Sequence, residues 1–119
     1  MSWKLDKNRP VCPQITEQIC VKIASGEFVA GEKLPSVREV ALEAGVNPNT
    51  VQKSFEQLEQ SGVIYSVRGS GNFVSNNISI AKQSAVEIIT QKTASYIEEM
   101  RRLGLDNAQI LKYIEELIK

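Results

Sequence analysis

The sequence predicts a mainly α-helical protein with one small β-hairpin, and three observations support that prediction. Two capped helix patterns follow each other between Ser36 and Ser61, a glycine-tipped hairpin pattern comes directly after them, and two further helix patterns fill residues 81–118. Two helices joined by a tight turn and followed by a hairpin form a winged helix-turn-helix. We therefore expect such a domain over residues 1–75 and an α-helical hairpin tail over residues 76–119.

The composition is that of an ordinary globular chain. Of its 119 residues, 42% are apolar and 24% are charged, which argues against disorder. No run is long enough to span a membrane, and the N-terminus lacks the apolar segment of a signal peptide, so we expect a cytoplasmic protein. With two cysteines and no histidine, no metal site and no cofactor are predicted. Cys12 and Cys20 are expected to be inert, reduced thiols, and a redox switch between them is the alternative.

The chain is expected to begin with a short extended arm over residues 1–12, because Pro10 and Pro13 resist helix formation. Within this arm, Trp3 is expected to pack on the flank of the domain, and stacking on a DNA base is the alternative. A first helix follows from Pro13 to Ser25, and it is predicted by the helical spacing of Ile15, Ile19 and Ile23.

The two central helices have clear boundaries. Ser36 and Glu39 have the spacing of a capping box, and Gly45 ends the helix that they begin. Asn47 then caps a second helix with Pro48 at its first position, where no amide donor is needed. Only two residues separate the helices, so the second helix is expected to cross the first steeply and to present its N-terminal end to a major groove.

After Gly62 the pattern becomes extended. Val63–Val67 and Asn72–Val74 are expected to pair around the turn Arg68–Gly71, which gives a short hairpin with a cationic tip. A phosphate-binding glycine loop is the alternative for this turn. Such loops are followed by a helix, whereas here a strand follows, so the hairpin is the stronger interpretation.

These residues resemble the GntR family of bacterial transcription regulators. The resemblance lies in four ordered motifs, Leu34–Ala41, Gly45–Val51, Leu58–Ile64 and Arg68–Val74, and it extends back to Gln14. In the family, a short strand before the first motif often pairs with the hairpin, and Phe28 is expected to point inward there.

The tail carries more apolar surface than a helical hairpin of this size can bury. Its first helix is expected over residues 81–103, and its second is capped by Asp106 with Gln109 three residues later. We expect two copies to pair through the tail into a homodimer, and packing against the head of the same chain is the alternative. The residues expected at the dimer contact are Ile88, Ile89, Tyr96, Ile97, Met100, Leu103, Ile110, Leu111, Ile114 and Leu117.

Other family members carry large ligand-binding or aminotransferase-like domains after the winged head. A short two-helix tail instead resembles the YtrA-like subfamily, which implies a dimer and a frequent association with ABC transporter genes.

Candidate DNA-contacting residues lie in the helix-turn-helix and at the hairpin tip. The resemblance implies that Arg38 faces DNA, and that Arg68 and Gly69 contact a minor groove. From its chemistry alone, the stronger interpretation of Arg38 is a solvated helix charge or an ion pair with Glu39 or Glu43. The start of the recognition helix supplies Asn47, Pro48, Asn49, Thr50, Gln52 and Lys53, which suit adenine, thymine methyl groups, guanine or phosphate; for Asn47 capping is the stronger role.

The sequence thus predicts a sequence-specific DNA-binding transcriptional regulator, a repressor that binds a palindromic operator as a homodimer. No catalytic residue is predicted, because there is no histidine, no nucleophile with an evident base and no paired carboxylates. The alternative is a winged protein-interaction or architectural module. It is favoured by the charge balance, since residues 1–75 carry eight Lys/Arg and eight Asp/Glu. A small-molecule effector between head and tail, or at the dimer contact, is left open.

Overall fold

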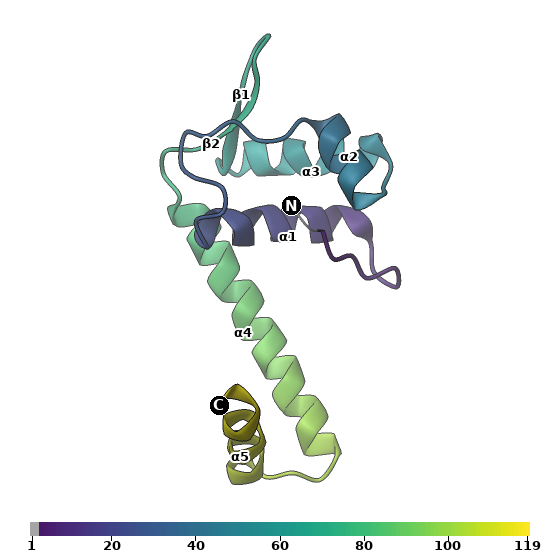
Figure 1. Cartoon of the computed structure of the whole chain (residues 1–119), viewed down its shortest axis with the longest axis vertical. Coiled ribbons are helices and arrows are strands. Elements are labelled where there is room, and N and C mark those ends of the chain that lie inside the picture. Colours follow the sequence, from purple (N-terminus) through teal and green to yellow (C-terminus); the bar gives the residue numbers. More distant parts are fainter. Residues whose placement is uncertain (1–2) are drawn as a thin grey trace. The chain divides into compact units, whose positions relative to one another are not determined.

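The computed structural model describes residues 3–119, which form five helices and one two-stranded sheet (Figure 1). The chain makes two compact units that divide within α4, the first ending at Val86 and the second running from Glu87 to Lys119. The predicted mainly α-helical class with a small hairpin is confirmed. The elements are α1 (Val11–Ala24), α2 (Val37–Ala44), α3 (Pro48–Gln60), β1 (Ile64–Val67), β2 (Gly71–Val74), α4 (Ser79–Arg102) and α5 (Asn107–Ile118).

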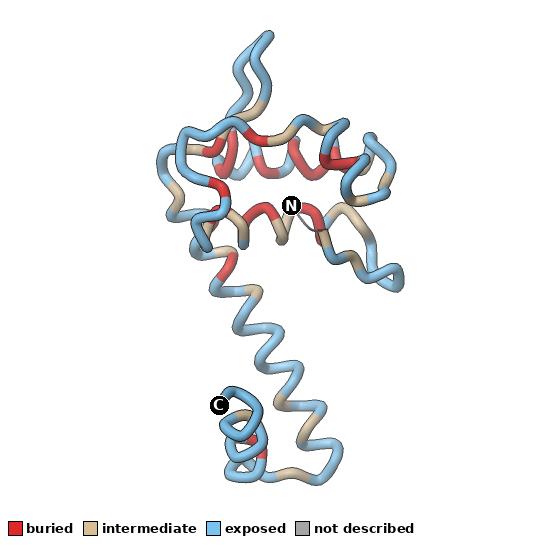
Figure 2. Tube along the Cα trace, viewed as in Figure 1, coloured by how far each residue is buried: buried red, intermediate tan, exposed pale blue. Residues whose placement is uncertain are grey.

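Helix α3 is at the centre of the first unit and packs against α1, α2 and β1. The buried residues of the unit concentrate on the facing sides of these elements (Figure 2). Burying a large aliphatic or aromatic side chain contributes about 1.5–3 kcal/mol, so a few such residues dominate the stability of the unit. The large apolar side chains with less than 2% exposure are Ile15, Ile19, Ile23, Val40, Val51, Leu58, Ile64 and Val74.

Helix α1 begins at Val11, two residues before the start that the prolines suggested. The sequence interpretation was wrong here because Pro13 occupies the first helical turn. Backbone N–H groups in that turn have no acceptor within the helix, so a residue without an N–H costs nothing there. The predicted extended arm therefore ends at Pro10, and its residues 1 and 2 lie outside the described part of the chain.

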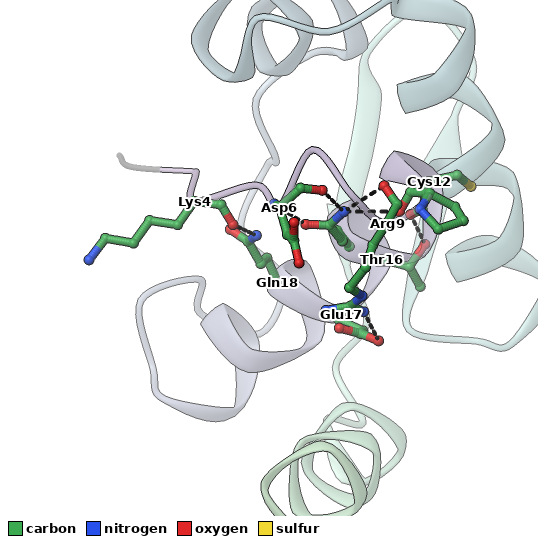
Figure 3. Close-up of polar contacts among 9 residues, drawn as sticks. Lys4, Asp6, Arg9, Cys12, Thr16, Glu17 and Gln18 are labelled. Carbon is green, nitrogen blue, oxygen red and sulfur yellow. Dashed lines mark hydrogen bonds and ion pairs between the residues drawn. The ribbon is translucent and has the colours of Figure 1, made fainter. Parts of the chain in front are cut away.

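The arm is held against α1 by two glutamine side chains (Figure 3). Gln14 is 3% exposed; its side-chain oxygen accepts the Asp6 N–H at 2.6 Å, and its Nε2 donates to the carbonyl groups of Asp6, Arg9 and Pro10. One turn further, Gln18 Nε2 donates to the Lys4 carbonyl at 2.7 Å. The irregular backbone of the arm thus finds hydrogen-bond partners in two side chains of α1.

Trp3 packs on the flank of the first unit, as predicted. Its ring is partly buried against the core, the Nε1–H donates to Glu43 at 3.4 Å, and the ammonium of Lys22 lies 5.1 Å from the ring centroid. The apolar ring of Trp3 and its polar N–H group therefore both have partners within the protein.

The hairpin pairs in antiparallel register, with Ile64 opposite Val74 and Tyr65 opposite Phe73. The rings of Tyr65 and Phe73 stack with their centroids 5.6 Å apart. The expected third strand is present only as a single bridge between Lys33 and Phe73, supported by a hydrogen bond from the Leu34 N–H to the Asn72 carbonyl at 2.8 Å. Aromatic cross-strand pairing and this bridge stiffen a hairpin that would be marginal alone.

The first two turns of α4 belong to the first unit. Ala81 and Ala85 are 1% and 5% exposed, and Ala81 is part of the core. The compact unit consequently extends to Val86, whereas the division expected from the sequence lies at residue 75.

The second unit consists of the remainder of α4 and of α5. The predicted capping box is present: Asp106 accepts the Gln109 N–H and the Gln109 side chain accepts the Asp106 N–H, both at 2.9 Å. Ile110 is buried, and Ile97, Met100 and Ile114 are half-buried. An open groove of about 370 Å³ remains, lined by Thr93, Ile97, Arg101, Asn107, Ile110, Leu111 and Ile114.

Much of the expected dimer contact is exposed in the single chain. Leu103 and Leu117 are 74% and 84% exposed, and Ile89, Tyr96 and Leu111 are exposed as well. Ile88 lies on a different side of α4 from Ile97. Nine residues separate the two, which places them roughly 180° apart around the helix. None of the helices in residues 3–119 has the length and apolar character needed to cross a bilayer.

Both cysteines lie on α1, Cys20 buried and Cys12 partly exposed. Eight helical residues span roughly 12 Å, whereas a disulfide needs Cα atoms within about 7 Å. The alternative of a redox switch between the two thiols of one chain is therefore excluded in this fold.

We expect a thiol reagent to modify Cys12 rapidly and Cys20 only slowly in the native protein. Burial raises the pKa of the Cys20 thiol, and its contact with Ser84 only partly opposes that effect, so little reactive thiolate is present at neutral pH. Spectrophotometric titration of Cys12→Ser and Cys20→Ser variants, with and without denaturant, measures each thiol separately. Equal native rates for the two variants would contradict the burial of Cys20.

Candidate nucleic-acid interface

The start of α2 is fixed by a capping box that also positions Arg38. The Ser36 hydroxyl accepts the Glu39 N–H at 3.0 Å, and the Glu39 carboxylate accepts the Ser36 N–H at 3.1 Å. Gly45 ends the helix in the left-handed conformation, at φ 68°, which favours glycine. Arg38 is the second residue of this short, well-bounded helix and its side chain is exposed.

Arg38 forms no ion pair among residues 3–119, and neither do Lys53 and Arg68. Both carboxylates considered as partners of Arg38 are used elsewhere. Glu39 accepts within the capping box, and Glu43 accepts from Trp3. The three cations are therefore available to an anionic ligand without the loss of an existing ion pair.

The recognition helix α3 begins as predicted. The Asn47 side chain accepts the Asn49 N–H at 2.8 Å, so its oxygen is used in capping, and Pro48 occupies the first helical position. A helix N-terminus also carries partial positive charge, which suits a phosphate nearby.

The faces of α3 divide its candidate residues. Val51, Phe55 and Leu58 are buried, and at 100° per residue Asn49 and Lys53 lie on the opposite, exposed side. Thr50 is half-buried beside the core, so it is the least accessible of the predicted contacts. Gln52 is exposed and its Nε2 donates to the Glu56 carboxylate at 3.4 Å.

The hairpin projects from the layer formed by α2 and α3 (Figure 1). Its tip consists of Arg68, Gly69 and Ser70, all exposed, and the Ser70 N–H closes the turn on the Val67 carbonyl at 2.9 Å. Gly69 has φ 81°, and no other atom lies within 4 Å of where its Cβ would be. The tip is slender and cationic, as contact with a narrow groove requires.

Two residues of this surface were not among the predicted contacts. Lys33 forms a backbone bridge with Phe73 of β2. Its side-chain Cε lies 3.1 Å from the position that a Cβ at Gly71 would occupy. Glu56 places a carboxylate on the exposed side of α3. The sequence shows that both residues lie in or near the helix-turn-helix. It does not show the bridge between Lys33 and Phe73, because that bridge depends on tertiary pairing.

The surface offers no other evident chemistry. Within residues 3–119, no group of three or more Cys, Asp or Glu side chains is placed to hold a metal ion. What the first unit brings together is a set of hydrogen-bonding side chains and cations on α2, α3 and the hairpin, which suits a polyanion with exposed base edges.

The sequence profile described as "Bacterial regulatory proteins, gntR family" matches residues 13–74, which is more than half of the chain. The chain belongs to this family. Its members are transcriptional regulators and not enzymes. In this chain α2 and α3 form the helix-turn-helix, and the β1–β2 hairpin after them is the wing.

Among relatives, the HTH-type transcriptional repressor YtrA of Bacillus subtilis (strain 168) is 34% identical over 112 residues, which cover 91% of this chain and 84% of YtrA. A GntR family transcriptional regulator from Listeria monocytogenes has a similar structure, with a TM-score of 0.79, 35% identity and coverage of 94% and 98% of the two chains. The match to YtrA includes the tail, so the predicted YtrA-like membership is confirmed.

A third similarity concerns DNA. The structure of AraR(DBD) in complex with operator ORE1 matches with a TM-score of 0.54 and 30% identity over 63% of this chain and 94% of that one. A gntR family head of this fold therefore binds an operator in AraR, and this chain is a DNA-binding regulator of the same family.

We expect the capping box to stabilise the protein in a pH-dependent way. The pKa of Glu39 is lowered, chiefly by the hydrogen bond from the Ser36 backbone and further by the Ser36 side chain and by Lys33. A lowered pKa means that the stabilisation is present at neutral pH and is lost as pH falls through the folded-state value. Glu39→Gln, which retains a capping box, should lower the melting temperature at pH 7.

The difference between Glu39→Gln and the native protein should shrink as pH falls through the lowered folded-state pKa of Glu39, because the carboxyl group then becomes neutral like the amide. Glu59→Gln, an exposed change on α3, serves as the control and should have little effect at either pH. A melting-temperature difference that is constant with pH would show that the charge of Glu39 is not involved.

Proposed function

We propose that this protein is a homodimeric repressor that binds a palindromic operator, with the N-terminal part of α3 in the major groove and the β1–β2 hairpin in the minor groove. The observation that carries the proposal is the set of exposed cations without ion pairs, Arg38, Lys53 and Arg68, on three elements of one packed unit. The name of YtrA supports the repressor assignment, and the AraR complex supports the operator as ligand.

The individual contacts follow from side-chain chemistry. Asn49 and Gln52 can pair with adenine, Lys53 suits guanine or phosphate, and Arg38, at the start of α2, also suits guanine or phosphate. Arg68 at the tip of a thin turn suits the negative potential of a narrow minor groove, and Gly69 permits close approach of the backbone. Lys33 joins this set as a proposed phosphate contact beside the hairpin.

The dimer is proposed from the apolar surface of the tail. Ile89, Leu103, Leu111 and Leu117 are exposed in the single chain, and Leu111 also lines the groove between α4 and α5. A second copy of the hairpin would cover them in a four-helix arrangement. Two-fold symmetry would also place two recognition helices on the half-sites of a palindrome.

The competing proposal is a winged module that binds protein or DNA without sequence preference, and the balanced charge of residues 1–75 favours it. The two proposals differ in one measurement. The regulator should enrich a palindromic consensus from a pool of random-sequence duplexes and should bind a scrambled duplex much more weakly. Equal affinity for consensus and scrambled duplexes would support the competing module.

We expect Arg38→Ala and Arg68→Ala to weaken binding to the selected consensus by about 1–3 kcal/mol each where the arginine contacts a base. Where Arg38 contacts phosphate, the salt dependence should fall by about one unit of slope. Fluorescence anisotropy at several salt concentrations measures both effects. Arg102→Ala, on the exposed ion pair with Glu98 in the tail, is the control and should bind as the native protein does.

Unchanged affinity of both arginine variants at matched salt would remove the two residues from the interface. Their melting temperatures should equal that of the native protein, because both side chains are exposed. A weakened variant with a normal melting temperature therefore reports binding and not folding.

We expect Leu103→Glu and Leu111→Glu to convert the dimer to a monomer and to reduce operator affinity. Both side chains are exposed in one chain, at 74% and 59%, so a charge there should not unfold the monomer but would be costly within an apolar contact. Sedimentation velocity gives the mass and circular dichroism checks the helix content. Gln91→Glu adds the same charge roughly 120° around α4 from Leu103 and should leave the dimer intact.

A native protein that sediments as a monomer while the operator is saturated would overturn the dimer. In that case the apolar tail surface must be covered in another way. If a variant lost the dimer but kept its operator affinity, DNA binding would not depend on dimerisation. A linked second head would then contribute nothing to affinity.

A further inference from the structure

The exposed face of α3 carries one feature that the proposed DNA contacts do not use. Glu56 follows Gln52 by one turn and Lys53 by three residues, and its side chain is exposed. Among the described residues it forms no ion pair with Lys53, although that spacing allows one. It accepts instead a hydrogen bond from Gln52 Nε2 at 3.4 Å.

A carboxylate on this face opposes binding to DNA in general. Phosphates surround both edges of a major groove, and a negative charge that enters it is repelled whatever the sequence. The repulsion is offset only where the carboxylate accepts a hydrogen bond from a base. In the major groove the donors are the amino groups of cytosine N4 and adenine N6.

The bond to Glu56 also determines how Gln52 is presented. A carboxylate only accepts hydrogen bonds, so Gln52 must turn its nitrogen, and not its oxygen, toward Glu56. The amide retains its second N–H and its oxygen. One N–H and one oxygen are the pair that contacts adenine N7 and N6, so the bond orients Gln52 without using up its adenine-binding groups.

We propose that Glu56 is a specificity-determining residue of the recognition helix. It orients Gln52 for adenine and permits close binding of α3 only where a neighbouring base offers an amino group to its carboxylate. The inference rests on the proposed function, since it requires α3 to enter a major groove. It gives a role to an exposed carboxylate that lies three residues from Lys53 on the recognition helix.

A purely structural role makes a different prediction. A Gln–Glu pair four residues apart on an exposed helix adds slightly to helix stability. Removal of the pair would then lower the melting temperature a little and leave base preference unchanged. Base preference is therefore the measurement that separates the two roles.

The experiment selects duplexes from a random-sequence pool with the intact native chain, with Glu56→Ala and with Glu56→Gln. We expect Glu56→Ala to lose preference at one or two positions of each half-site, and its affinity for scrambled duplex to rise about twofold to fivefold. The ratio of consensus to scrambled affinity should fall at least roughly fivefold, the discrimination that one base pair supplies. Glu56→Gln should raise scrambled affinity similarly while it retains part of the preference, because its side-chain oxygen still accepts.

Glu59→Gln is the matched control, since it removes the same charge from the same helix one turn further from the N-terminus. It should leave the consensus unchanged. An identical consensus and an identical affinity ratio for native protein and Glu56→Ala would overturn the inference, as would an equal effect of Glu59→Gln. A native protein that selects no consensus would overturn the proposed function itself, so the two failures are distinguishable.

Discussion

The first unit depends on one constraint: the helix proposed to contact DNA is also the helix on which the core is built. Val51, Ser54 and Leu58 of α3 are 0–1% exposed, and α1, α2 and β1 all pack against that side. Even the buried polar residue serves this contact, because the Ser54 hydroxyl donates to the Cys12 carbonyl of α1 at 2.9 Å. With that side fixed, the outward direction of Asn49, Lys53 and Glu56 is fixed as well.

The parts that the sequence predicted well are those determined by local hydrogen bonds. The capping boxes of Ser36 with Glu39 and of Asp106 with Gln109 are each formed within four residues, so their chemistry is visible in the sequence. The predicted start of α1 was wrong because a proline resists helix formation in general but is harmless in the first turn, where Pro13 lies. A local sequence pattern predicts a helix end correctly only when the effect of each residue is judged for its own position in the terminal turn.

The parts that could not be predicted depend on distant contacts. Ala81 and Ala85 become buried only because the start of α4 packs within the first unit, and small residues give no hydrophobic pattern to announce this. Gln14 is equally unremarkable in sequence, yet it is 3% exposed and ties the arm to α1. The pairing of Gln52 with Glu56 has the right spacing for contact, but spacing alone does not tell which of two neighbours, Lys53 or Gln52, the carboxylate selects.

The charge balance of the head follows a consistent logic when its ion pairs are considered. Eight acidic residues offset eight basic ones in residues 1–75. The two acidic side chains of α2, Glu39 and Glu43, accept hydrogen bonds within the protein. Arg38, Lys53 and Arg68, in contrast, form no ion pair among residues 3–119. A head with modest attraction for phosphate binds random DNA weakly.

In the proposed dimer, two such heads are linked, and the binding free energies of two half-sites combine. Each base preference of one head then contributes to the binding free energy at both half-sites. The linked second head also raises the affinity for a true operator, which offsets the weak non-specific attraction of each head. In the proposed mechanism, a neutral head and a dimerising tail are therefore complementary, and base contacts on α3 decide where the protein binds.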